Sequence, residues 1–350
     1  MNLTNLHIAI VAGSTSSEHD VSLTSATNIY RALKEITPNL YPLYLDKTNQ
    51  WMLLDATLEA PYQDISRAKP ILLQKEDMRL DILSKKQQKI GQIDLFFPAL
   101  HGKFGEDGAI QGYFELLGIS YVGADVTASA LAMDKEFTKI ILADAGIPVL
   151  PHLVINKRDN EYPSFSDACK ELSRDILFVK PARAGSSVGI SKVQDQMQWE
   201  EALTLALLHD DKILIEPALA VREVEIGILD DGEQVHASIA GEIAYEKGFY
   251  DYEQKYSAES QVQLHIPALI HETILAEFQQ LAIKAHQKLG IKGLSRVDFF
   301  LTKDSNEIFL NEINTLPGFT DKSMYPLLWQ SMGLSQSHLL KKLIESSLKS

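Results

Sequence analysis

The stretch FLNEINTLPG, residues 309–318, decides the fold, because an apolar strand here gives way to an acid, an amide and a Pro-Gly break. Successive side chains of a β-strand point to opposite faces of the sheet. Strict alternation places Glu312 and Asn314 on the same face as Ile308 and Leu310. We therefore expect an apolar face that ends in two oxygen donors.

A second strand, LSRVDFFLT, lies just upstream and is joined to the first by the turn-rich link KDSN. A link of this length suits a β-hairpin. A turn centred in it places Asp298 opposite Glu312 and Arg296 opposite Asn314. Two carboxylates and an amide on one face indicate a site for a hard cation such as Mg²⁺, which prefers oxygen ligands. The alternative is a solvated sheet end with an ion pair to Arg296.

The composition is that of a globular protein. The chain has 350 residues, of which 45% are hydrophobic and 23% charged, so two or three domains are expected. A formal charge of -14 argues against a general nucleic-acid or membrane-surface binder, and no segment approaches the roughly 20 apolar residues that span a bilayer. Cys169 is the only cysteine, and the N-terminus has no basic leader region. These features predict a cytoplasmic enzyme.

The first third of the chain alternates strand and helix patterns, which predicts a parallel α/β domain. In such a sheet, ligands gather at the carboxyl ends of the strands. The segments 13–18 and 101–108 both follow a strand, and we expect them to line one crevice. The polar stretch 67–91 reads as an irregular elaboration with short strands.

Two lysine-bearing segments follow. The pattern of residues 128–146 predicts one helix that ends at Gly146, with Lys135 and Lys139 one turn apart. Lys180 ends a strand and precedes the glycine-serine loop 184–189. Serine hydroxyls and backbone N–H groups can cradle phosphate beside a lysine. The alternatives are a solvated helix surface and a plain glycine turn.

The order of the motifs is more specific than any one of them. MDKEFTK, VKPARAGSSVG, ILIEPAL, SRVDFF and NEINTLPGF are similar, in this order, to the ATP-grasp superfamily. With GSTSSEHDVS, PALHGKFGEDG, YDYEQKY and DKSMYP added, the chain resembles the D-alanine–D-alanine ligases from about residue 7 to about residue 340. The resemblance implies an ATP-grasp fold, with an N-terminal parallel α/β domain (1–121) followed by two α+β domains (122–219 and 220–350) that sandwich ATP.

The resemblance also implies roles for individual residues. The implied ATP contacts are Lys135, Lys180, Ser187, Glu216, Leu219, Glu223 and Lys255. The implied ligands of two Mg²⁺ or Mn²⁺ ions are Asp298, Glu312 and Asn314. The implied substrate-binding residues are Glu18, His101, Arg296, Gly318, Ser323 and Met324. The implied catalytic set is Glu18, Ser186, Tyr256, Arg296, Gly318 and Ser323.

The implied reaction joins two D-alanine molecules through an acyl phosphate, for peptidoglycan precursor synthesis, in a homodimer whose loop 246–260 closes as a lid. Sister ligases that accept D-serine or D-lactate second are the nearest alternatives, and Tyr256 argues against the lactate type. A nucleotide sensor without turnover is the alternative from another class. Glu18 could instead cap the following helix, and His101 could be a turn histidine.

Overall fold

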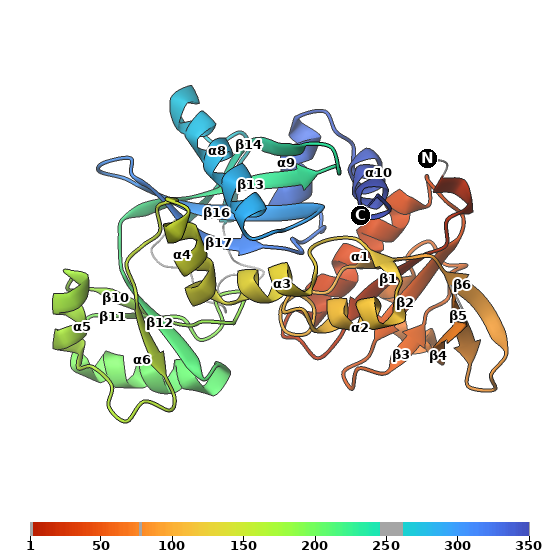
Figure 1. Cartoon of the computed structure of the whole chain (residues 1–350), viewed down its shortest axis with the longest axis horizontal. Helices are drawn as coiled ribbons and strands as arrows, with labels where there is room; N and C mark the ends of the chain where they lie inside the picture. Colours follow the sequence, from red (N-terminus) through yellow and green to blue (C-terminus); the bar gives the residue numbers. More distant parts are fainter. Residues whose placement is uncertain (1–2, 77–78, 246–261, 350) are drawn as a thin grey trace.

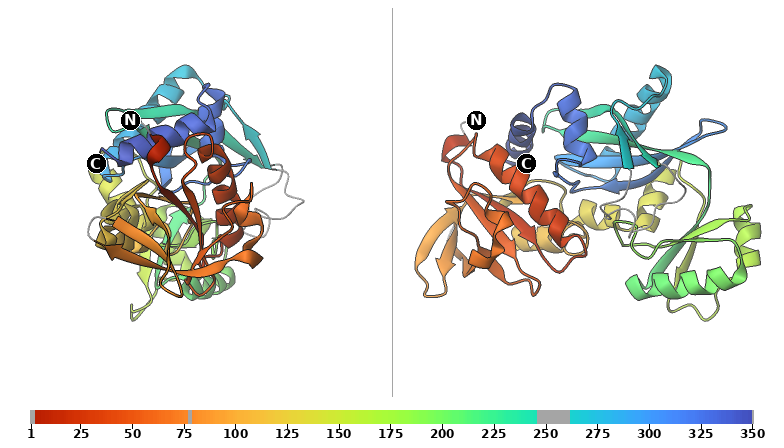
Figure 2. Two further views of the ribbon diagram at one scale, coloured as in Figure 1. Left: turned by 90° about the vertical axis from the view of Figure 1, so that its right-hand side faces the viewer. Right: turned by 180° about the vertical axis from the view of Figure 1, so that it is seen from behind.

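The computed structural model describes residues 3–76, 79–245 and 262–349. Its strands form three sheets, each drawn from a successive part of the chain. Figure 1 shows the first sheet on the right, the second at the lower left and the third above, with helices α3 and α4 between them. The two chain ends lie on the same side of the molecule, near helices α1 and α10, as the reverse view in Figure 2 also shows.

The first sheet has the strand order β6-β5-β4-β3-β2-β1-β7-β8. Its strands are β1 (Ile8–Gly13), β2 (Leu40–Leu45), β3 (Trp51–Leu53), β4 (Lys69–Glu76), β5 (Arg79–Ser84), β6 (Lys89–Ile93), β7 (Leu95–Pro98) and β8 (Ser120–Tyr121). Strand β1 is buried throughout because both of its faces are covered: alternate residues pack against α1 (His19–Leu33) and against α2 (Ala109–Leu117). The carboxyl ends of β1 and β7 therefore lie side by side, as expected.

The expected parallel sheet is only part of what forms. Strands β2, β1, β7 and β8 are parallel, but β3 to β6 are antiparallel. The elaboration expected over 67–91 contains strands, as predicted, but it is not irregular, because β4, β5 and β6 pair in order and extend the sheet. Ile71, Leu80 and Ile82 are buried in its core, which gives this polar stretch one apolar face.

The expected single helix over 128–146 was also wrong. The structure has α3 (Val126–Met133) and α4 (Lys135–Asp144), separated by Asp134 in an extended conformation. The Asp134 side chain caps α4 by accepting from the Phe137 N–H, while the Lys135 N–H donates to Ala182 O at 3.1 Å. The break therefore ties the start of α4 to the end of the strand that carries Lys180.

The second sheet has the order β11-β10-β12-β9 and lies at the end of the molecule farthest from the first sheet (Figures 1 and 2). Its strands are β9 (Leu153–Asn156), β10 (Leu177–Pro181), β11 (Ser191–Val193) and β12 (Lys212–Pro217). Helices α5 (Phe165–Leu172) and α6 (Gln196–His209) bury one face against Val179, Ile213 and Ile215. Lys180 and Glu216, by strand alternation, belong to the other face.

The third sheet has the order β15-β14-β13-β16-β17. Its strands are β13 (Val221–Asp230), β14 (Val235–Tyr245), β15 (Val262–His265), β16 (Leu294–Thr302) and β17 (Ile308–Asn314). Helix α8 (Glu272–Lys288) packs on one face, and α9 (Met324–Ser331) leads to α10 (Gln336–Ser347), which packs beside α1. Within the described ranges, no helix is both long and apolar enough to cross a membrane.

The hairpin register agrees with the prediction, but strict alternation along β17 does not hold. Asp298 lies opposite Glu312 and Arg296 opposite Asn314, as expected. The register shifts between Asp298 and Phe299, because a β-bulge inserts Asn311. Leu310 thus belongs to the core under α8, whereas Glu312 and Asn314 lie on the opposite face.

Candidate active site

The open face of β16 and β17 carries a compact set of charged and amide side chains. Arg296 donates from Nε and Nη2 to the two oxygens of Asp298, each at 2.7 Å, and its Nε lies 3.1 Å from Glu225 Oε2. Asn314 Nδ2 donates to Asp298 Oδ2 at 2.9 Å. The side chain of Glu312 is 31% exposed. The ion pair with Arg296 and the proposed metal ligands therefore occur on one face.

The donor chemistry of this set fits a divalent cation that is also held by phosphate. Asp298 and Glu312 are direct neighbours across the hairpin, and Asn314 adds an amide oxygen. Mg²⁺ is usually held by one or two carboxylates together with waters and substrate phosphates. Among the described residues, no group of three or more His, Cys, Asp or Glu side chains is arranged to hold a metal alone. Such a site would need the substrate to complete it.

Two lysine side chains reach this face, Lys135 from α4 and Lys180 from β10. Lys135 Nζ donates to Ala184 O at 2.8 Å and lies 3.4 Å from Glu312 Oε2. Lys180 Nζ lies 2.5 Å from Glu216 Oε2 and 3.5 Å from the bulge residue Asn311. Both lysines are buried, so the alternative of a solvated helix surface is wrong for Lys135.

Glu216 joins two lysines in a buried cluster. Lys139 Nζ lies 2.6 Å from Glu216 Oε1, and Lys180 approaches the other carboxylate oxygen. Burial raises the pKa of Glu216, but the two lysines outweigh it and lower the pKa to about 2. Glu216 is therefore ionised in the folded protein at neutral pH.

The glycine-serine loop 184–189 contacts the segment that links β1 to α1. Ser186 Oγ donates to Glu18 Oε1 across the boundary between the first and second sheets. Glu18 is the N-cap residue of α1 but makes no side-chain cap hydrogen bond, which does not support the capping alternative. Ser186 and Ser187 have φ values of 53° and 59°, a left-handed conformation that is uncommon for serine. Such local strain is concentrated at functional sites.

His101 connects the first sheet to the segment that follows β17. Its Nδ1 lies 3.0 Å from Leu316 O and its Nε2 lies 3.1 Å from Ser25 Oγ. Because the Leu316 carbonyl can only accept, the proton of neutral His101 lies on Nδ1, and Nε2 accepts from the Ser25 hydroxyl. Burial lowers the pKa of His101 and favours this neutral form.

The segment after β17 positions the remaining residues that the resemblance implies for substrate binding. Ser323 Oγ accepts from the Thr320 N–H at 2.9 Å and occupies the N-cap of α9. A Cβ on Gly318 would lie 2.7 Å from Ser323 Oγ, so only glycine lets the backbone approach this hydroxyl. The Met324 side chain is buried against Gly241.

Two further implied ATP contacts, Leu219 and Glu223, lie near the junction of the second and third sheets. Leu219 is partly buried in the link between β12 and β13, and Glu223 on β13 pairs with Phe300. The proposed lid 246–260, which includes Lys255 and Tyr256, lies outside the described residues.

Comparisons with known proteins agree with this geometry. Residues 7–124 match the family model "D-ala D-ala ligase N-terminus", and residues 141–345 match "D-ala D-ala ligase C-terminus". The D-alanine–D-alanine ligase A of Salmonella typhimurium is 39% identical over 99% of this chain and 97% of its own length. The chain belongs to the D-alanine–D-alanine ligase family.

Solved structures of similar proteins extend the match to the fold. The D-alanine-D-alanine ligase of Coxiella burnetii matches with a TM-score of 0.85 and 32% identity, over 99% of this chain and 96% of that chain. The VanG D-Ala:D-Ser ligase of Enterococcus faecalis matches with a TM-score of 0.84 and 34% identity, over 98% of this chain and all of that chain. The ATP-grasp fold expected from the sequence is thus confirmed for this D-alanine–D-alanine ligase family member.

In this D-alanine–D-alanine ligase family member, two site carboxylates were missed by the sequence analysis. Glu106 accepts from the Gly102 N–H at 2.7 Å and from the Leu316 N–H at 3.4 Å, so it links the first sheet to the segment after β17. The sequence could have indicated Glu106, because it lies in the motif HGKFGEDG, residues 101–108, which begins with His101. Glu225 is 4% exposed and faces Arg296. Its position two residues after Glu223 on a strand could have placed both on one face.

Glu106 gives a prediction for pH dependence. Burial and the nearby Glu18 carboxylate raise the pKa of Glu106 to about 8. A raised folded-state pKa means that the native state binds an extra proton between about pH 4.5 and pH 8. The contribution of Glu106 to the free energy of unfolding is therefore fully present below pH 4.5 and is lost as the pH rises through about 8. Glu106→Gln should flatten this decline, measured by urea unfolding between about pH 5 and pH 9. The exposed Glu115→Gln variant is the control. Parallel curves for Glu106→Gln and wild type would contradict the assignment.

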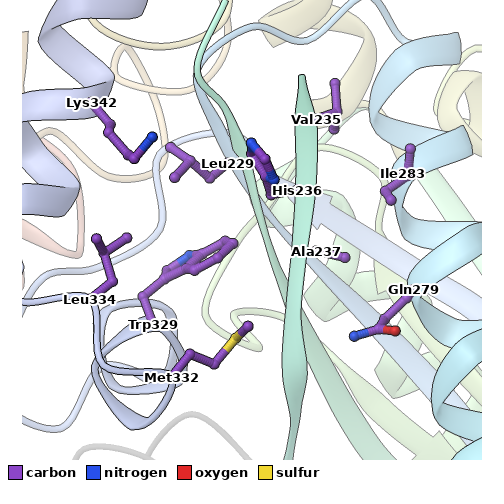
Figure 3. Close-up of a pocket in the computed structure, with 10 residues that line it drawn as sticks. All are labelled: Leu229, Val235, His236, Ala237, Gln279, Ile283, Trp329, Met332, Leu334 and Lys342. Carbon is purple, nitrogen blue, oxygen red and sulfur yellow. The ribbon is translucent and has the colours of Figure 1, made fainter. Parts of the chain in front are cut away.

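This ligase family member has a pocket that does not belong to the candidate active site. A cavity of about 450 Å³ lies between β14, α8, α9 and α10 (Figure 3). Trp329, Met332 and Leu334 supply apolar walls, while His236 and Lys342 line its polar side. None of the described residues implied for ATP, metal or substrate lines it.

Proposed function

We propose that this protein joins two D-alanine molecules to D-alanyl-D-alanine at the expense of ATP. The observation that carries the proposal is the meeting of three chemically different groups in one place. Lys135 and Lys180 supply positive charge, Asp298 and Glu312 supply metal-type carboxylates, and the Glu18–Ser186 pair can accept an ammonium group. Phosphate, divalent cation and amino acid are the three things that an ATP-dependent amino-acid ligase must hold together.

The first step transfers the γ-phosphoryl group of ATP to the carboxylate of the first D-alanine, which gives an acyl phosphate and ADP. Lys135 and Lys180 would hold the phosphates, with Ser187 beside them in the loop and Glu216, Leu219 and Glu223 toward the nucleoside. Asp298, Glu312 and Asn314 would hold two Mg²⁺ or Mn²⁺ ions, which supply charge neutralisation during phosphoryl transfer. The lysines and the loop backbone orient the phosphates for in-line attack.

The second step forms the amide bond. The amine of the second D-alanine attacks the acyl carbon, the C–O bond to phosphate breaks, and inorganic phosphate and a proton leave. Arg296, opposite Asn314 on the hairpin, and the N–H of Gly318, in the segment that follows β17, are the groups proposed to stabilise the oxyanion. Glu18 would hold the first ammonium, with His101 nearby, while Ser323 and the backbone at Met324 would hold the second carboxylate. Loop 246–260, with Lys255 and Tyr256, would exclude water.

The proposal is tested by ADP release with D-alanine alone, with D-alanine plus D-serine and with D-alanine plus D-lactate, and by the mass of each product. Formation of D-alanyl-D-alanine from D-alanine alone is the expected result, with L-alanine as the control. The similarity to a D-Ala:D-Ser ligase makes the mixed D-alanyl-D-serine product the main competing outcome. Absence of ADP release with every substrate would overturn the proposal.

The Ser186–Glu18 hydrogen bond gives a separate prediction. Ser186→Ala removes a donor to a carboxylate, a bond worth about 1.5–3 kcal/mol, so the KM for the first D-alanine should rise by at least about ten-fold. Steady-state kinetics with saturating ATP measure this. Ser191→Ala, on β11 of the same sheet, is the control. Equal KM values for Ser186→Ala and wild type would show that the bond has no part in substrate binding.

We also propose the division into domains 1–121, 122–219 and 220–350, a homodimer and a cytoplasmic location. Each sheet falls within one of the three ranges, which supports the division. The need for ATP and the single cysteine support the location. The family resemblance supports the dimer, which sedimentation measurements would test.

A further inference from the structure

The buried cluster of Lys139, Glu216 and Lys180 contains more positive charge than its one carboxylate requires. Lys139 is 1% exposed, Glu216 3% and Lys180 6%, and both lysines contact the same carboxylate. Lys180 is also 3.5 Å from Asn311, at the edge of the face that carries Asp298 and Glu312. Lys139 approaches the other oxygen of Glu216 from α4.

The position of Lys139 is fixed by charges on its own helix. Lys212 on β12 lies 2.7 Å from Asp134 and 2.6 Å from Glu136, which clamps the first turn of α4 against the strand that carries Glu216. A Lys139 ammonium in this place cannot move far. Lys180, on β10, lies between Glu216 and the open face instead.

We propose that Lys139 is a positioning residue: it is the permanent counter-ion of Glu216, and it releases Lys180 from that carboxylate to the phosphates when ATP binds. The inference rests on the proposed function, in which Lys180 holds phosphate and Glu216 faces the nucleobase. An ion pair that loses one partner leaves an uncompensated buried charge, which is strongly unfavourable. With Lys139 present, Glu216 keeps a cation after Lys180 has moved.

A second consequence concerns the choice of nucleotide. An ionised carboxylate only accepts hydrogen bonds, so Glu216 would select the 6-amino group of adenine and disfavour the carbonyl at that position of hypoxanthine. A protonated Glu216 could donate to the carbonyl. Lys139 therefore supports ATP over inosine triphosphate by keeping Glu216 ionised.

The test compares Lys139→Met, Lys139→Arg and the exposed-lysine control Lys192→Met with wild type. Binding of a non-hydrolysable ATP analogue with Mg²⁺ is measured by calorimetry in buffers of different ionisation heat, between about pH 6 and pH 9. In Lys139→Met, Glu216 must take up a proton when Lys180 leaves it, so affinity should fall as the pH rises and binding should consume protons beyond the wild-type number. The other charged groups around the cluster, Lys135 and His152, are unchanged in every variant.

We expect Lys139→Met to weaken analogue binding by about ten-fold at pH 8 and to lower the ratio of kcat/KM for ATP to that for inosine triphosphate by a similar factor. Lys139→Arg and Lys192→Met should behave as wild type. A merely structural lysine would not change proton uptake or the nucleotide ratio, so unchanged values in folded Lys139→Met would overturn the inference.

Two further outcomes are decisive. If Lys139→Met does not fold, the same measurements are made on Lys139→Gln, whose amide can still donate a hydrogen bond to Glu216 but carries no charge. Excess proton uptake on analogue binding is again expected, and its absence would overturn the inference. If wild type makes no dipeptide, the proposed function fails, while linked proton uptake on analogue binding still tests Lys139.

Discussion

Glu312→Gln is expected to reduce turnover by at least about 100-fold while the protein still folds. Glutamine keeps the shape of the side chain but has no charge, so it cannot neutralise divalent cations beside the phosphates as a carboxylate does. Stability should change little, because Glu312 is 31% exposed and its contact with Lys135 is 3.4 Å long. A single ion pair of this kind contributes about 1 kcal/mol or less.

The measurement is D-alanine-dependent ADP release at ordinary Mg²⁺ concentration, together with urea unfolding. Glu307→Gln is the matched control, because Glu307 is an exposed glutamate just before the same strand. It should leave both quantities unchanged. Wild-type turnover in Glu312→Gln would show that the acidic end of β17 is structural.

Arg296→Met is expected to lower the free energy of unfolding by about 3–5 kcal/mol and to abolish turnover. Arg296 holds two carboxylates at once, Asp298 through two 2.7 Å bonds and Glu225 at 3.1 Å. Methionine fills similar volume but leaves both acids without their cation. Lysine keeps the charge but not the forked pair of bonds, so Arg296→Lys should lose less stability.

Arg222→Met separates stability from catalysis. Arg222 lies in the same sheet and donates two 2.7 Å hydrogen bonds to a single carboxylate, that of Glu242. By strand alternation its side chain lies on the α8 face, opposite the face that carries Arg296. We expect a smaller loss of stability and full turnover. Adding Glu225→Gln to Arg296→Met should restore part of the stability, because one unpaired acid is removed. No recovery in this double variant would show that the loss comes from packing and not from charge.

Several features of the site follow from local sequence alone. The Asp298–Glu312 and Arg296–Asn314 pairs could be predicted because a short turn fixes the register of a hairpin, and opposite residues share a face. The end of β1 at Gly13 and the strand that carries Lys180 were also predictable, since apolar runs bounded by glycine or proline mark buried strands.

Other features depend on partners far away in the chain. The helix pattern over 128–146 is continuous, yet it breaks at Asp134, because the Lys135 N–H bonds to Ala182 O in another sheet. Short strands were expected in 67–91, but their pairing as an antiparallel extension of the first sheet was not, because the sheet edge to which β4 to β6 add is formed by residues elsewhere in the chain. Strict alternation along residues 309–318 predicts that Glu312 and Asn314 share a face with Leu310. The bulge at Asn311 instead places them on the face opposite the α8 core.

What the sequence by itself determined was therefore the order of the motifs, the hairpin register and, through resemblance, the chemistry of the site. Only the tertiary structure decided that Lys139 is buried against Glu216, that Arg296 serves Glu225 as well as Asp298, and that Glu106 bridges Gly102 and Leu316. The physical reason is that burial and counter-charge are properties of the assembled fold. A charged residue on one helix or strand carries no local signal of the partner that another element will bring to it.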